Sequence, residues 1–275
     1  MAFSECGGIY RVGIVGMGTI GRAIALALDS GDIPVHLAAV HSRDAEKAEA
    51  FAATLNAKPP VMALNELIAS SDLVIEAATQ AALATIAPAT LEAGKDLMVL
   101  SVGGLLDHPE WADLADRQHC KLYVPSGAIV GLDGVKGACA GRIDSVTITT
   151  RKPPEGLDGA PYVVEQGIDV YALTEETLIF EGSAREACKG FPANVNVSAA
   201  LSLAGIGPDQ TRIRIMAVPG GTRNMHDVEV IGEFGRMTSH IENVPSDTNP
   251  RTGKLSYLSA IAMLREIAGA VRYGN

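Results

Sequence analysis

Three glycines near the start of the chain have the spacing of a phosphate-binding turn. Gly16, Gly18 and Gly21 follow the apolar stretch 12–15 and precede the helix-like stretch 22–28. In a dinucleotide-binding strand–turn–helix, the first glycine makes the tight turn and the second lets the backbone approach a pyrophosphate. The third lets the helix pack closely on the strand. We therefore predict that this turn binds a dinucleotide; a purely structural glycine turn is the alternative.

The helix after the glycines adds donors to the same site. Thr19 and Ile20 lie in the glycine turn just before this helix, whose free backbone N–H groups and positive dipole end attract phosphate. Thr79 follows the predicted strand 72–77, and ligands of doubly wound sheets lie beyond the carboxyl ends of the strands. We predict that Thr79 lines the cofactor site, and the turn 101–104 either does so too or is an ordinary turn.

Arg43 is the residue that bears on the choice between NAD and NADP. An acidic residue is expected about 20 residues past the glycines, where it binds the ribose hydroxyls and repels a 2′-phosphate. The predicted second strand, 34–40, is instead followed by His41, Ser42 and Arg43. Because arginine pairs well with phosphate, we predict that NADP is used at least as well as NAD. The alternative is a solvated Arg43 beside Asp44 as a helix N-cap.

His226 is the candidate for acid–base chemistry. It follows the segment 219–225, which is predicted to be a loop between two strands, and catalytic residues concentrate on loops held by a rigid sheet. An imidazole near its free pKa of about 6.5 can take a proton at neutral pH. The alternative is an ordinary surface histidine on an exposed loop.

Alternating strands and helices position these residues in the first part of the chain. Apolar strands predicted over 34–40, 72–77 and 97–101 alternate with helices, which implies a parallel sheet covered on both faces. We predict an α/β fold with an N-terminal Rossmann-type, doubly wound parallel sheet. This dinucleotide-binding domain is assigned to residues 1–125 plus 246–275, because the final helix, 254–272, is expected to return to it.

The pattern changes after residue 125. Residues 142–151 alternate with period two, as a half-buried strand does, and 211–218, 227–234 and 237–244 are predicted to be successive antiparallel strands. Ser183 has the character of a helix N-cap. We assign 126–245 to a smaller α+β domain, with a mostly antiparallel sheet, for substrate binding, catalysis and dimerisation.

Composition excludes several function classes. The 275 residues carry a formal net charge of −10, which argues against a nucleic-acid partner or an anionic membrane. The four cysteines are far apart and form no C-x-x-C pair, so disulfides and a metal site are not expected. Neither a signal peptide nor a membrane-spanning stretch is predicted, and we expect a cytoplasmic location.

Several segments together resemble the L-aspartate dehydrogenase family. The similarity runs from the glycine loop through 249–252 to the last helix and is far more specific than the glycines alone. The segments that carry it are 126–138 (SGAIVGLDGVKGA), 150–154 (TRKPP), 190–207 (GFPANVNVSAALSLAGIG), 211–216 (TRIRIM) and 224–226 (NMH).

The resemblance implies oxidation of L-aspartate to iminosuccinate with NAD or NADP, reversible as reductive amination. The imine hydrolyses to oxaloacetate and ammonia or feeds quinolinate and NAD biosynthesis. By the family's pattern His226 is catalytic, and Ala128 contacts the cofactor together with an asparagine of the Pro-x-Asn-x-Asn run. Asn194 is the first choice for that asparagine and Asn196 the second. A homodimer is also implied.

The two carboxylates of aspartate require cationic or N–H donors. Lys136, Arg223 and Arg251 are the candidate cations, and each could instead be a surface residue. Asn224, in the Asn-x-His run, is a further candidate substrate contact. Gly253 stands where many relatives are expected to have serine, which puts a side-chain contact there in doubt.

Two other functions are compatible with a dinucleotide-binding turn. One is a two-domain reductase of the dihydrodipicolinate reductase or homoserine dehydrogenase type. The first of these has a His-His-x-x-Lys-x-Asp run and a Pro-Ser-Gly-Thr loop, and neither is in this sequence. The other is a non-catalytic dinucleotide sensor, which would bind nucleotide without turnover.

Overall fold

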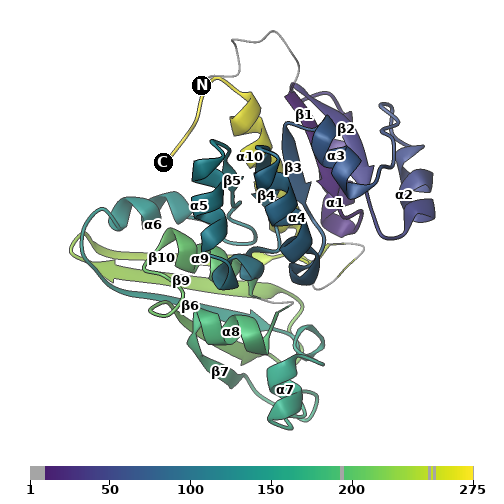
Figure 1. The fold of residues 1–275 in the computed structure, drawn as a ribbon. Coiled ribbons are helices and arrows are strands. Elements are labelled where there is room, and N and C mark those ends of the chain that lie inside the picture. The colour runs from purple at the N-terminus through teal and green to yellow at the C-terminus, as the bar shows by residue number, and fades with distance from the viewer. Residues whose placement is uncertain (1–9, 193–194, 247–248, 250–251, 275) are drawn as a thin grey trace. The chain divides into compact units, whose positions relative to one another are not determined.

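Each half of the protein builds its own sheet (Figure 1). The computed structural model describes residues 10–192, 195–246, 249 and 252–274. The chain divides into two compact units, Met1–Pro125 with Tyr257–Arg272 and Ser126–Ser256 with Tyr273–Asn275. The predicted fold class, a doubly wound parallel sheet plus a mostly antiparallel one, is confirmed.

The sheet of the first unit is parallel throughout. Its strands lie in the order β2-β1-β3-β4-β5. The strand after β1 lies on one side of it and the later strands lie on the other. The order of connection therefore switches between β1 and β3, and doubly wound sheets bind ligands at such a switch point. The bounds are β1 Tyr10–Val15, β2 Val35–His41, β3 Leu73–Glu76, β4 Asp96–Val99 and β5 Leu122–Tyr123.

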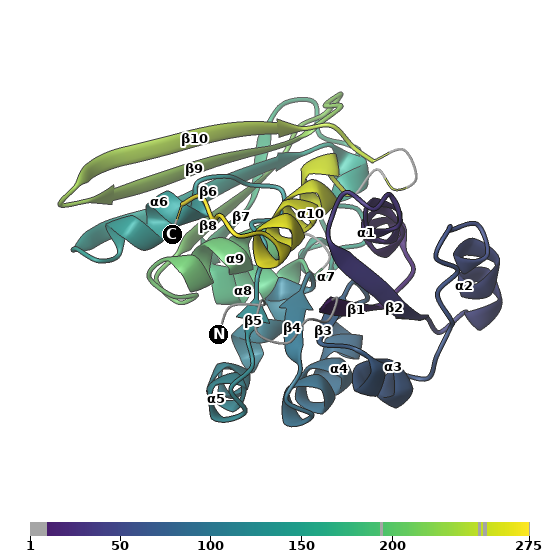
Figure 2. The ribbon, with the colours of Figure 1, turned by 90° about the horizontal axis from the view of Figure 1, so that it is seen from above.

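Helices cover both faces of this sheet, which explains why its strands are apolar on both sides. Figure 2 shows α1 and α10 on one side and α3, α4 and α5 on the other. Ala260 and Leu264 of α10 are fully buried in the core of this unit. The helices are α1 Thr19–Asp29, α2 Ala45–Ala52, α3 Leu64–Ser70, α4 Gln80–Glu92, the 3₁₀ helix η1 Val102–Asp107, α5 Glu110–Arg117 and α10 Lys254–Ala268.

The second sheet has the strand order β10-β9-β6-β8-β7. All its pairs are antiparallel except β6 with β8. The expected run of successive antiparallel strands is therefore corrected, because β6 lies between β8 and β9. Its elements are α6 Leu132–Ala138, β6 Ile143–Lys152, the 3₁₀ helix η2 Pro154–Gly156, α7 Pro161–Glu165, β7 Thr177–Ser183, α8 Ala184–Gly190, α9 Asn196–Ala204, β8 Arg212–Ala217, β9 Asn224–Gly232 and β10 Gly235–Asn243.

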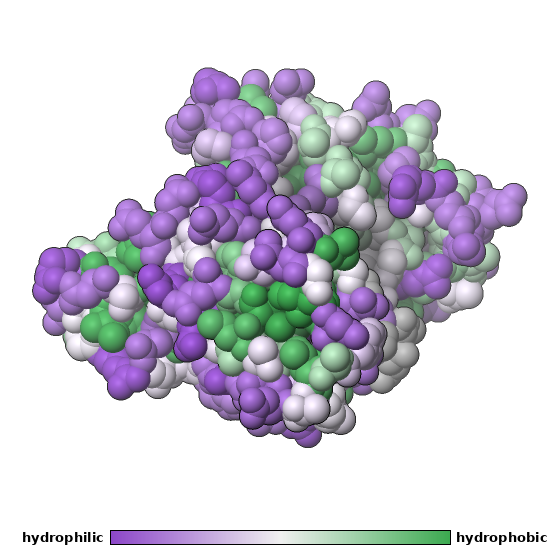
Figure 3. All heavy atoms as spheres, turned by 90° about the horizontal axis from the view of Figure 1, so that it is seen from below, coloured by the Kyte–Doolittle hydropathy of each residue, from purple (hydrophilic) through white to green (hydrophobic). Residues whose placement is uncertain are grey.

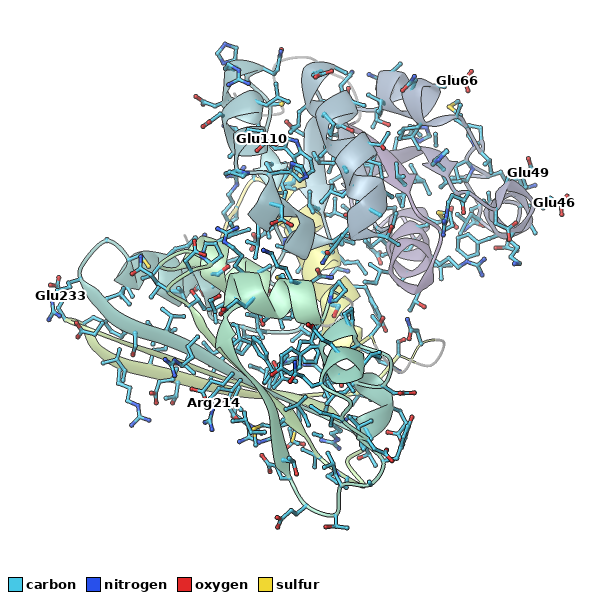
Figure 4. All side chains as sticks on the ribbon, turned by 60° about the horizontal axis from the view of Figure 1, so that its bottom comes forward. Glu46, Glu49, Glu66, Glu110, Arg214 and Glu233 are labelled. Atoms are coloured by element: carbon cyan, nitrogen blue, oxygen red, sulfur yellow. The ribbon has the colours of Figure 1, made fainter. Side chains whose placement is uncertain are left out.

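The two faces of the second sheet differ in character. One face packs under α6, α8 and α9 and is apolar over most of its length, with Val146, Ile148 and Val228 buried. The other face carries ion pairs, and Arg214 of β8, labelled in Figure 4, lies near Glu181 there. The predicted N-cap at Ser183 is confirmed, since its hydroxyl accepts from the Glu186 N–H in a capping box.

Polar side chains replace apolar ones at one end of the covered face. Where β6, β9 and β10 meet, buried polar residues succeed the aliphatic ones. We call this set the polar end cluster: Thr150, Lys152, Asn224, His226 and Asn243. Among the described residues, no helix is both long and apolar enough to cross a membrane.

Candidate active site

The three glycines of the first turn have different surroundings. Gly16 has a φ of +102°, and a Cβ there would lie 2.4 Å from the Ala77 carbonyl oxygen. A Cβ on Gly21 would lie 1.9 Å from the Gly16 carbonyl oxygen, so both positions are fixed by the packing of the turn itself. A Cβ on Gly18 would meet no described atom within 4 Å. Gly18 thus faces open space, as the approach of a ligand requires.

A cavity of about 610 Å³ opens beside this turn, within the size range of small-molecule sites. Gly18 is the N-cap of α1 and makes no side-chain cap hydrogen bond, and the first turn holds no acidic residue. The start of this helix, with Thr19 and Ile20, therefore suits an anion. The cavity is lined by Val15–Gly18, His41–Asp44, Leu64, Ala77–Thr79, Ala81, Ala82, Thr85 and Ile86.

Arg43 lines this cavity, and the carboxylate of its neighbour Asp44 is already bonded to Lys47. The Asp44 carboxylate caps α2 by accepting from the Lys47 N–H at 3.1 Å and pairs with the Lys47 ammonium at 2.8 Å. Arg43 makes no hydrogen bond or ion pair within the described part of the chain. Glu46 and Glu49 of α2 point away from the body of the protein (Figure 4). The local charge that remains available at the cavity edge is therefore positive.

Replacing Arg43 with alanine is expected to raise the KM for NADP about tenfold or more and to leave the KM for NAD nearly unchanged. A charge-assisted hydrogen bond to the 2′-phosphate is lost, and NAD has no such group. Initial rates with each cofactor and fluorescence titration of binding measure the effect. Lys47→Ala, which removes a cation already paired with Asp44, is the matched control. An equal change for both cofactors would remove the phosphate role.

The polar residues that follow β3 and β4 differ in their relation to the cavity. Thr79 lines the cavity and caps α4 by accepting from the Ala82 N–H at 3.2 Å. The Ser101 hydroxyl, by contrast, donates to the buried Glu76 carboxylate at 2.9 Å. Ser101 is therefore a structural residue of the 101–104 turn, which forms part of η1, and it is not among the residues lining the cavity.

Glu76 was not singled out in the sequence, and it joins two strand ends. Besides the Ser101 hydroxyl, it accepts from the N–H groups of Ala78 at 2.8 Å and Ser101 at 2.9 Å. Burial raises the pKa of the Glu76 carboxyl, and the hydrogen bonds from Ser101 and Ala78 oppose that rise. The signal that could have found it is a single acidic residue closing an otherwise apolar strand.

His226 lies in β9 and not in a loop, which corrects the prediction from the sequence. Its side chain is 3% exposed and belongs to the polar end cluster. Its Nδ1 lies 3.0 Å from the Thr150 hydroxyl on the neighbouring strand β6. If the Nδ1–H donates to Thr150, Nε2 is left as the acceptor, which is the form a general base needs.

The expectation that His226 titrates near its free pKa is also corrected. Burial, and then the charge of Lys152, lower the pKa of His226 to about 3, with Asp227 acting in the opposite direction. The imidazole is therefore neutral at physiological pH. In the free protein it is a weak base, and it does not repel a cationic amino group.

The unliganded protein is expected to lose stability on acidification because of His226. Its folded pKa of about 3 lies below the unfolded value of about 6.5, so the unfolded chain binds more protons between them. The contribution of neutral His226 is complete above about pH 6.5 and is lost as the pH falls toward 3. Denaturant unfolding at several pH values, compared with His226→Gln, measures it; identical slopes would contradict a buried neutral imidazole.

Ala128 is hydrogen-bonded to a residue of the polar end cluster. The Asn243 side chain donates from Nδ2 to the Ala128 carbonyl oxygen at 2.9 Å. A Cβ on Gly127 would lie 3.6 Å from the Val197 side chain, so the Ala128 loop also lies against the start of α9, where Asn196 is the first residue. A Cβ on Gly253 would come within 2.9 Å of the Asn243 Cβ, so glycine suits that position here.

The substrate candidates from the sequence are not brought together. Asn224 is buried on the same face of β9 as His226. Arg223 points to the opposite side, where it pairs with Glu242 at 2.7 Å. Lys136 is exposed on α6, whose Gly134 packs against Met237, six residues along β10 from Asn243. Asn194 and Arg251 lie outside the described residues.

Lys152, Thr150 and Asn243 were not predicted from the sequence as site residues. Lys152 falls just past the strand predicted over 142–151, and Asn243 falls in the strand predicted over 237–244, where it was given no role. The signal was available in the alternation of β6, where Val146, Ile148, Thr150 and Lys152 share the buried face. A polar residue in the buried phase of a strand needs a partner or a ligand.

Family models divide the chain in the same way as the two sheets. Residues 133–267 match the model described as "Aspartate dehydrogenase, C-terminal", and residues 16–125 match "Homoserine dehydrogenase, NAD binding domain". Among solved structures, aspartate dehydrogenase from Thermotoga maritima has a TM-score of 0.74 at 23% identity, covering 97% of this chain and 100% of that one.

Curated relatives match almost the whole chain. L-aspartate dehydrogenase from Methanosarcina mazei is 50% identical over 271 residues, covering 97% of this chain and 100% of the relative. L-aspartate dehydrogenase from Bradyrhizobium diazoefficiens is 47% identical, covering 93% of this chain and 91% of the relative. Identity of this extent establishes that the chain belongs to the L-aspartate dehydrogenase family.

Proposed function

We propose that this protein is an NAD(P)-dependent L-aspartate dehydrogenase, which oxidises L-aspartate to iminosuccinate and runs in reverse as a reductive amination. The observation that carries the proposal is a buried, neutral His226 within the half of the chain that matches the aspartate dehydrogenase model. The nucleotide-binding half supplies the glycine turn and an open cavity beside it.

The residues around the cavity fit a dinucleotide. The space above Gly18 admits a pyrophosphate, and Arg43 suits a ribose phosphate at the cavity edge. When bound, the nicotinamide accepts a hydride from substrate carbon. The protein binds and orients the cofactor and the substrate, and it accepts and releases protons.

His226 accepts a proton from the substrate amine. A hydride can leave Cα only as the nitrogen lone pair forms the C=N bond, so the ammonium group of aspartate must first lose a proton. The neutral Nε2 accepts that proton in the tautomer whose Nδ1–H donates to the Thr150 hydroxyl. Once that proton has passed to solvent, the same imidazole can activate the water that adds to the imine and releases ammonia and oxaloacetate.

The test is oxidation of a panel of amino acids with NADP or NAD, followed at 340 nm, and the reverse reaction of oxaloacetate with ammonia. We expect turnover with L-aspartate and consumption of NAD(P)H in reverse. Turnover with homoserine or malate in its place would contradict the proposal. Cofactor binding with no turnover of any substrate would indicate a dinucleotide sensor.

We also propose that the protein is a cytoplasmic homodimer. Figure 3 shows an apolar patch ringed by hydrophilic residues on one face, and patches of this kind mark association surfaces. Val164, Tyr171 and Leu178 are exposed on the second unit. Cys120 and Cys139 are free thiols, as in a reducing compartment. Light scattering after gel filtration should give twice the 28.6 kDa of one chain; a value of one chain would contradict the dimer.

A further inference from the structure

Lys152 is a lysine buried among the residues of the candidate active site. Its residue is 4% exposed, whereas most lysines are at the surface. A cation at a buried position in an enzyme for a dicarboxylate is chemically suited to bind a carboxylate.

The register of the sheet places Lys152 next to His226. Thr150 is paired with His226 across β6 and β9, and Lys152 is the next residue along β6 on the same buried face. Two residues along a strand correspond to about 6.6 Å. A base and a cation that neighbour one another on one face can hold the amino group and a carboxylate of the same amino acid.

Two further observations support this placement. The charge of Lys152 acts on the imidazole of His226, which requires the two groups to be close. The aliphatic stem of Lys152 packs on Gly156, where a Cβ would lie 3.6 Å from its Cβ and Cδ. Asp227, the other charged group that acts on His226, lies on the opposite face with Arg151 and His240.

We propose that Lys152 binds a carboxylate of the substrate at the polar end cluster, beside the His226 base. The inference rests on the proposed aspartate dehydrogenase function and gives Lys152 the role for which Lys136, Arg223 and Arg251 were the candidates from the sequence. An ammonium provides three donors, so it can hold a carboxylate oxygen while Asn224 lies alongside.

This arrangement couples substrate binding to the strength of the base. A carboxylate beside Lys152 offsets the positive charge that disfavours a proton on His226. Bound substrate therefore makes the imidazole a stronger base than it is in the free protein. The enzyme would hold a weak base when empty and a stronger one when aspartate is in place.

The experiment compares Lys152→Met and Lys152→Arg with the wild type. Succinate, which has two carboxylates and no amine, is the probe, and its Kd is measured by calorimetry in the presence of NADP. We expect Lys152→Met to raise the Kd of succinate and the KM of aspartate about 10- to 100-fold, the range for a lost charged hydrogen bond. Lys152→Arg should retain part of the affinity, and NADP binding should be unchanged in both.

Two further variants provide a control and a test of the alternative carboxylate-binding residue. Lys189→Met removes an exposed cation of α8 in the same unit and should leave succinate binding and aspartate kinetics unchanged. Lys136→Met tests the candidate from the sequence. If Lys136→Met weakens succinate and Lys152→Met does not, the assignment to Lys152 is wrong.

The remaining outcomes separate this inference from the proposed function. A folded Lys152→Met protein with wild-type succinate affinity overturns the inference, even if its kcat falls, because Lys152 would then only tune His226. If Lys152→Met does not fold, Lys152→Arg decides: succinate binding and a KM for aspartate identical to wild type overturn it, because the longer, forked side chain cannot reproduce the lysine contact. A wild type that binds NADP but does not oxidise aspartate contradicts the proposed function instead.

Discussion

Replacing His226 with alanine is expected to lower kcat for aspartate oxidation by about 10²- to 10⁴-fold, the usual contribution of one acid–base group. The neutral imidazole is the group that takes the ammonium proton, and without it the lone pair needed for the C=N bond is rarely available. Because His226 lies in the second unit and the cofactor cavity in the first, NADP binding should survive the change.

The measurement needs a check on folding, since His226 is buried and bonded to Thr150. Thermal melts with and without NADP establish that the variant folds and binds, and His226→Gln fills the space if alanine does not fold. His240→Ala is the matched control, because this histidine lies on the open face of the same sheet, paired with Asp227. A folded His226 variant with near-normal turnover would place the base elsewhere.

The nucleotide-binding half was predictable because its signals are local in the sequence. Gly16, Gly18 and Gly21 act within one turn, so their spacing alone marks them, although the Ala77 carbonyl that crowds Gly16 comes from the end of β3. Arg43 was found in the same way, by counting from the glycines to the end of the next strand. Such a site can be recognised before the fold is known.

The catalytic half was only partly predictable because its signals depend on strand register. Predicting the end of β6 at Arg151 left Lys152 in a loop, and an error of one residue in a strand moves a side chain to the other face or out of the sheet. The 226 position was recognised through family resemblance, but its burial follows from its pairing with Thr150. Glu76 escaped notice because two of its donors belong to Ser101, 25 residues further on.

Two glycines of the first turn should respond in opposite ways to the same substitution. Gly18→Ala is expected to keep the wild-type melting temperature and to weaken NADP binding about tenfold or more. The backbone there has φ −80° and ψ −163°, which alanine adopts without strain, and its Cβ meets no described atom within 4 Å. The methyl group therefore costs the fold nothing, but it occupies the space that the pyrophosphate needs.

Gly21→Ala should instead destabilise the fold. Alanine is favoured over glycine inside a helix by about 1 kcal/mol, but its Cβ would lie 1.9 Å from the Gly16 carbonyl oxygen, a backbone atom that cannot move aside without opening the turn. Overpacking of this kind costs about 1–3 kcal/mol or more, so the clash outweighs the helix preference and the melting temperature falls by several degrees. Differential scanning fluorimetry and fluorescence titration with NADP separate the two effects. A stable Gly21→Ala protein, or a Gly18→Ala protein with wild-type NADP affinity, would contradict the division of roles between these glycines.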